Sequence, residues 1–72
     1  MSPDKLALMA NQIATALRHK GDGTAGATAE HINDFWEPRM RAELLAMIAA
    51  ADPRLSETVH AAGGAIRAPG TA

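Results

Sequence analysis

The sequence predicts a small all-α protein, a compact bundle of three to four short helices. Alanine, leucine and methionine dominate and β-branched residues are sparse, a composition that favours helix. Apolar residues recur at steps of three and four, the spacing of a buried helix face. Serine–proline, glycine and proline signals divide the 72 residues into segments of helix length. We expect one helical domain over residues 1–62 and a flexible C-terminal tail over residues 63–72.

The first helix is expected over residues 3–20. Ser2 can cap its first turn, and Pro3 suits the first helical position. Gly21 is a stop signal, and the three glycines of residues 21–26 predict a flexible loop. One apolar stripe runs along this helix, formed by Leu6, Met9, Ile13 and Leu17 and widened by Ala10 and Ala14.

A proline separates the second and third helices. Thr24 or Thr28 is expected to cap the second helix, which should run to about residue 36. Pro38 disfavours helical geometry at Glu37 and fits the first turn of a new helix. The third helix is therefore expected over residues 38–51.

The fourth helix is expected to start at Asp52-Pro53, a second cap-then-proline signal. Leu55 and Val59 share its apolar face, and Gly63-Gly64 ends it. Ile66 is the one residue of the following tail that we expect to be able to dock on the bundle.

The core predicted for this chain is small. The apolar content of 47% overstates it, because seventeen of those residues are alanine, which buries little surface. Small domains usually compensate with disulfides, a metal or a partner. The chain has no cysteine, which excludes disulfides and thiolate metal sites and fits a reducing compartment. A partner chain is the remaining means of stabilisation.

Several classes of function are disfavoured by the same sequence. The N-terminus does not resemble a signal peptide, and no apolar run has the roughly 20 residues that span a membrane. A net charge of −1 argues against a general nucleic-acid binder. We expect no catalytic, cofactor-binding or metal site within this chain. No nucleophile–base pair or phosphate-binding loop is apparent, and the histidines are widely separated: His19, His31 and His60.

Residues 35–41, FWEPRMR, hold both aromatic residues of the chain, Phe35 and Trp36. Adjacent residues on a helix diverge by about 100°, so one aromatic ring can fill the core while the other is left near the surface. Trp, Arg and Met are enriched where proteins bind each other. We therefore predict a partner interface of Trp36, Arg39, Met40 and Arg41, with Phe35 shared with the core. Two alternatives are that both aromatics are core residues and both arginines are solvated, or that a helix-turn-helix binds DNA.

One further polar residue has two interpretations. Asn11 lies within the first helix, where asparagine is a mediocre helix former, so it is either solvated or bonded to a loop or a partner backbone.

Two motifs resemble the delta subunit of NAD-dependent, molybdenum-containing formate dehydrogenases. These are MANQIA, from Met9, and HI-x-x-FW-x-PRM, from His31, and the Asp52-Pro53-x-Leu55 segment is also similar. The resemblance covers about residues 4–62, and it makes Asn11 and His31, which lie in the matching motifs, lesser candidates for the interface. The family often has aspartate where this chain has Glu37, and an aromatic residue near the end of the first helix where this chain has Ala16-Leu17-Arg18.

The resemblance implies a non-catalytic accessory subunit of a soluble, cytoplasmic oxidoreductase complex. In such complexes the alpha subunit holds bis-molybdopterin guanine dinucleotide and iron–sulfur clusters and oxidises formate. The beta and gamma subunits carry FMN and further clusters and reduce NAD. The delta subunit is then expected to stabilise or assemble the alpha subunit, or, alternatively, to act as a maturation chaperone during insertion of the molybdenum cofactor.

Overall fold

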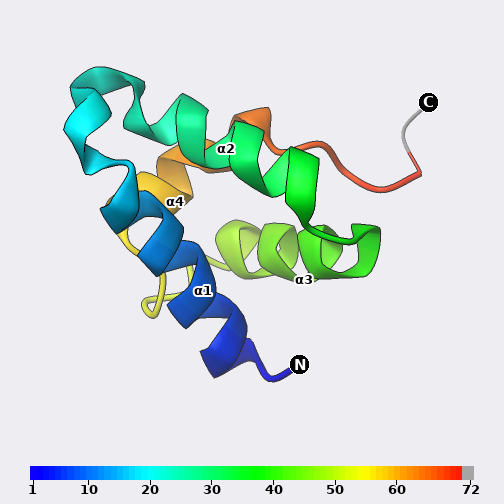
Figure 1. Cartoon of the computed structure of the whole chain (residues 1–72). Helices are drawn as coiled ribbons and strands as arrows, with labels where there is room; N and C mark the ends of the chain where they lie inside the picture. The colour runs from blue at the N-terminus through cyan, green and yellow to red at the C-terminus, as the bar shows by residue number, and fades with distance from the viewer. Residues whose placement is uncertain (71–72) are drawn as a thin grey trace.

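The computed structural model describes residues 1–70, and these form an all-helical domain without strands. Four α-helices follow one another as α1 (Pro3–Ala16), α2 (Thr24–Phe35), α3 (Pro38–Ala49) and α4 (Glu57–Ala62). Two 3₁₀ helices, η1 (Arg18–Gly23) and η2 (Gly63–Ala65), follow α1 and α4. Figure 1 shows α3 lying below α2, with α1 at the lower left and α4 between α1 and α2 in this view. The predicted small helical bundle is confirmed.

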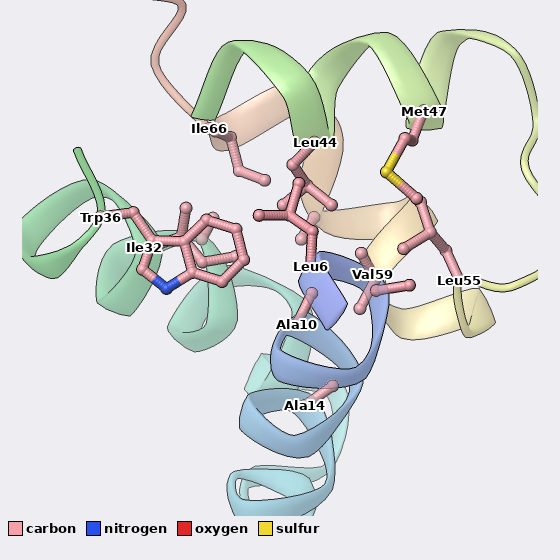
Figure 2. Close-up of a cluster of buried hydrophobic side chains, with 13 residues drawn as sticks. Leu6, Ala10, Ala14, Ile32, Trp36, Leu44, Met47, Leu55, Val59 and Ile66 are labelled. Atoms are coloured by element: carbon pink, nitrogen blue, oxygen red, sulfur yellow. The ribbon is translucent and has the colours of Figure 1, made fainter. Parts of the chain in front are cut away.

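Each α-helix contributes one large apolar side chain that is fully buried in the core. These are Leu6 from α1, Ile32 from α2, Leu44 from α3 and Val59 from α4. Figure 2 shows them converging, with the Trp36 indole and Ile66 beside them. A single core therefore holds segments from both ends of the chain together.

The buried face of α1 is shifted from the predicted stripe. Ala7, Ala10 and Ala14 are buried beside Leu6, whereas Met9 and Ile13 are only partly buried. Small side chains let helix backbones approach closely, and α1 contacts α2, α3 and α4. The alanines are thus packing residues.

The start of α1 agrees with the sequence prediction, but its end does not. Ser2 Oγ accepts a hydrogen bond from Lys5 N at 3.2 Å, as expected of a capping serine. The α-helix stops at Ala16, four residues earlier than predicted. The carbonyl of Leu17 instead accepts hydrogen bonds from Lys20 N and Thr24 Oγ1, which supports the tighter turns of η1.

The predicted flexible loop over residues 21–26 is wrong. Gly21 makes the turn with φ of 58°, and α2 already begins at Thr24, so Gly26 is helical. Neither threonine caps this helix, because the N-cap is Gly23. The buried Thr28 hydroxyl donates to Thr24 O at 2.7 Å, the usual way in which a threonine inside a helix satisfies its polar group.

The end of α3 and the start of α4 also differ from prediction. The chain leaves α3 through Ala51, which has a positive φ of 54°. Asp52 N bonds to Met47 O and Ala51 N to Ile48 O, the paired hydrogen bonds of a Schellman motif. Asp52 then accepts Arg54 N at 2.9 Å in a turn, and Ser56 caps α4 through Val59 N at 3.3 Å. The Asp-Pro signal marks a turn, four residues before the helix.

The C-terminal tail packs in part on the bundle. Residues Gly63–Ala65 form η2, and Ile66 is buried in the core, as the sequence allowed. Gly63 lies so close to α3 that an added Cβ would sit 2.9 Å from Ile48 Cγ2. The part of the predicted flexible tail over residues 71–72 lies outside the described residues.

Candidate partner interface

A sharp corner joins α2 to α3. Trp36 and Glu37 are extended, with ψ of 140° and 153°, and Pro38 starts α3 as predicted. A residue before proline is driven out of the helical region by the proline ring, which accounts for the extended Glu37. The Trp36 N–H still completes α2 by donating to Ile32 O at 2.9 Å.

The structure reverses the expected positions of the two aromatic side chains. Trp36 is 7% exposed and packs in the core, whereas Phe35 is 74% exposed. Figure 2 shows the indole directed into the cluster towards Leu6. The reason is backbone geometry: Trp36 and the buried Ile32 share one side of α2, and Phe35 is turned about 100° from it. The expectation that Phe35 is shared with the core is therefore wrong.

Phe35 has one intramolecular ring contact, to the exposed His31. Their ring centroids are 4.7 Å apart and the planes are tilted by 38°. The two residues are four apart on α2, the spacing at which helix side chains meet. They form an aromatic surface patch that the bundle leaves uncovered.

The two arginines of the corner have different environments. Arg41 donates from Nη1 to Trp36 O at 2.9 Å and from Nε to Arg67 O at 3.0 Å, so its guanidinium is already bonded within the chain. Arg39 is exposed and makes no side-chain hydrogen bond or ion pair within residues 1–70. Met40 is half-buried against the core. Of the predicted arginines, only Arg39 presents a guanidinium without internal partners.

Four exposed carboxylates lie on the same two helices and their junction: Glu30, Asp34, Glu37 and Glu43. Both ion pairs found within residues 1–70 are made elsewhere, by Arg54. These four carboxylates outnumber the two arginines of the same segment, Arg39 and Arg41, which favours a partner surface with basic groups and disfavours nucleic acid.

Asn11 bonds to a neighbouring loop, one of the alternatives left open by the sequence. Its Nδ2 donates to Arg54 O at 2.8 Å, and its Oδ1 accepts Ser56 N at 2.9 Å. Both ends of the amide are used to join α1 to the segment before α4. The structure thus gives Asn11 an internal role.

Arg54 is a second polar junction that the sequence did not reveal. Its side chain donates to Asp52 at 3.0 and 2.6 Å and to Asp4 at 2.8 Å. Hydrogen bonds from the Arg54 side chain and backbone lower the pKa of Asp52 from 3.8 to about 2, and the pKa of Arg54 is raised in turn by Asp52 and Asp4. Residues 4 and 54 are too far apart in sequence for any periodicity to pair them.

Comparison with protein families decides the identity of the chain. Residues 5–62 match the family model of the NADH-dependent formate dehydrogenase delta subunit, FdsD. The chain belongs to this family. This delta subunit is therefore a small subunit of a formate dehydrogenase complex, with the other subunits as its partners. Comparisons with curated proteins and with solved structures found no match.

The described part of this delta subunit offers little for binding a cofactor. The chain has no cysteine, and residues 1–70 contain no group of three His, Asp or Glu side chains placed to hold a metal ion. No pocket is found in the surface of these residues. None of their helices is long and apolar enough to cross a membrane. Thiolate-bound clusters therefore lack their usual donors in this chain.

Proposed function

We propose that this delta subunit is a non-catalytic accessory subunit that stabilises or assembles the molybdenum-containing alpha subunit, and that it binds through the α2–α3 corner. The observation that supports the proposal is the exposure of Phe35, at 74% the highest among the exposed large apolar residues. The chain leaves this aromatic in water although its core is built from few large side chains.

The interface we propose is revised from the sequence prediction. Phe35 replaces Trp36 as the anchor, with His31, Arg39 and the exposed part of Met40 around it. Trp36 and Arg41 hold the corner in shape from within. A partner pocket with apolar walls, bordered by basic groups opposite the carboxylates of α2 and α3 and by an acidic group opposite Arg39, complements the exposed ring and the charges on these helices.

The proposal assigns the redox chemistry to the other subunits. Bis-molybdopterin guanine dinucleotide, iron–sulfur clusters, FMN and NAD belong to the alpha, beta and gamma subunits in this assignment, and none is bound by the delta subunit. We place the whole complex in the cytoplasm.

Co-purification of the alpha subunit with tagged delta-subunit variants tests the proposal. Phe35→Ser and Arg39→Ala should reduce the recovered alpha subunit, because they change exposed side chains and leave the core intact. Leu8→Ser is the matched control, since Leu8 is also exposed, at 56%, but lies on α1. Undiminished recovery with Phe35→Ser, or loss only with Leu8→Ser, would refute this interface.

Removing the delta subunit from the finished complex separates a structural role from a maturation role. A fall in formate oxidation supports stabilisation of the assembled alpha subunit. Persisting activity supports the alternative of a chaperone for cofactor insertion. In that case the alpha subunit should contain less molybdenum when it is expressed without the delta subunit, but should keep its molybdenum when the delta subunit is removed afterwards.

A further inference from the structure

The segment after η2 docks beside the α2–α3 corner as an extended strap, which we define as residues 65–67. Ile66 has φ of −80° and ψ of 126°, and its side chain is 6% exposed. Figure 1 shows this segment in orange and red, and η2 contacts α2. In Figure 2 the Ile66 side chain points into the cluster beside Leu44. One aliphatic side chain anchors the strap in the core.

Asn33 on α2 binds the backbone of the strap with both ends of its amide. Its Nδ2 donates to Ala65 O at 3.0 Å, and its Oδ1 accepts Arg67 N at 2.8 Å. An asparagine side chain carries the same donor and acceptor as a peptide group. The Asn33 amide therefore forms hydrogen bonds with the strap backbone as a neighbouring β-strand would, and these bonds do not involve the side chains of the strap.

Arg41 on α3 connects the strap to the corner. One guanidinium donates to Arg67 O at 3.0 Å and to Trp36 O at 2.9 Å. Trp36 is the residue at which α2 ends, and Phe35 precedes it. The backbone that orients Phe35 is thus tied to the strap by Arg41 as well as by Asn33.

We propose that the strap is a positioning element for the partner interface: its docking fixes the corner with Trp36 inside and Phe35 outside. This inference rests on the proposed function, because it assigns a positioning segment to the interface proposed there. The residues that hold the strap, Asn33 and Arg41, lie within the family match of residues 5–62, whereas the strap lies beyond it. The strap therefore lies outside the matched region, while the residues that bind it lie inside that region.

Full-length variants test the inference with two independent readouts. Asn33→Ala removes the two hydrogen bonds between the Asn33 amide and the strap backbone, and it keeps a good helix former in α2. Ile66→Ala removes the anchor. Arg67→Ala is the matched control, because Arg67 holds the strap through its backbone N and O, which the substitution retains; its side chain adds only a long contact of 3.5 Å to Asn33 O.

The first readout is the fluorescence of Trp36, the only tryptophan of the chain. Asn33→Ala and Ile66→Ala should shift the emission to the red, because release of the strap exposes the indole. The second readout is binding to the alpha subunit, which both variants should weaken, by about tenfold for the loss of two hydrogen bonds in Asn33→Ala. Arg67→Ala should change neither. Circular dichroism verifies that the helices of each variant remain.

The outcomes separate failure of this inference from failure of the proposed function. A red shift with unchanged binding, or no red shift in either variant, overturns the positioning role. Full binding by Phe35→Ser refutes the proposed interface itself, and then weaker binding by Asn33→Ala would no longer support positioning of Phe35. Weaker binding by both strap variants and by Phe35→Ser, with Arg67→Ala unaffected, supports both.

Discussion

Replacing the two adjacent aromatic residues by alanine, one at a time, should give very different losses of stability. Trp36 is 7% exposed, and truncating a buried aromatic side chain costs about 3–5 kcal/mol. Phe35 is 74% exposed, so burial of its remaining quarter, at about 25 cal/mol per Å² over an aromatic side chain of roughly 200 Å², contributes about 1 kcal/mol at most. A domain of 72 residues has a free energy of unfolding of about 4–11 kcal/mol. Trp36→Ala should therefore remove a large share of it.

Urea unfolding followed by far-ultraviolet circular dichroism measures both variants, since fluorescence is lost with the indole. With a slope of about 1 kcal/mol per M urea, Trp36→Ala should lower the midpoint by roughly 3 M or prevent folding, and Phe35→Ala by less than about 1 M. Leu8→Ala, which removes another exposed side chain, should behave like Phe35→Ala. An equal or larger loss for Phe35→Ala would refute the assignment of the indole to the core.

Three further changes test the local geometry. Ala51→Gly should raise the free energy of unfolding by about 1 kcal/mol, measured by urea unfolding, because an L-residue with positive φ is strained; an unchanged midpoint would contradict this. Gly63→Ala should lower the free energy of unfolding by about 1–3 kcal/mol, because the added methyl group clashes with Ile48. The same substitution should cost less in a chain that already carries Ile48→Ala, and an equal cost in both chains would argue against this clash. The pKa of Asp52 in the folded chain, about 2, lies below its ordinary 3.8, so its contribution to stability is present above 3.8 and lost as the pH falls through 2. The stability of Asp52→Asn should vary less over that range, and an unaltered pH profile would argue against the Arg54 contact.

The sequence predicted features of the fold that depend on local chemistry. Ser2 and Pro38 act through the backbone of their own helical turn, so their roles can be read without tertiary information. The end of α3 could not be read in this way. A Schellman motif usually shows itself by a glycine, and here an alanine takes the left-handed conformation instead.

The sequence predicted a partner interface at the α2–α3 corner, and it assigned the two aromatic residues there to the wrong sides. Helical geometry requires Phe35 and Trp36 to diverge, yet which of them meets the core depends on the position of Leu6, thirty residues upstream. The same limit applies to Arg41, whose partner Arg67 belongs to the strap. Contacts between distant segments leave no periodic trace in the chain.

The alanines on the buried face of α1 have a consequence for the entropy of folding. A buried leucine or methionine loses rotamer freedom when its side chain is fixed, whereas alanine has no rotamer to lose. Ala7, Ala10 and Ala14 bury little surface each, but they exclude water from the centre of the bundle without that loss. Larger residues at these positions would increase the apolar surface and yet weaken the protein, because they would force α1 away from its neighbours.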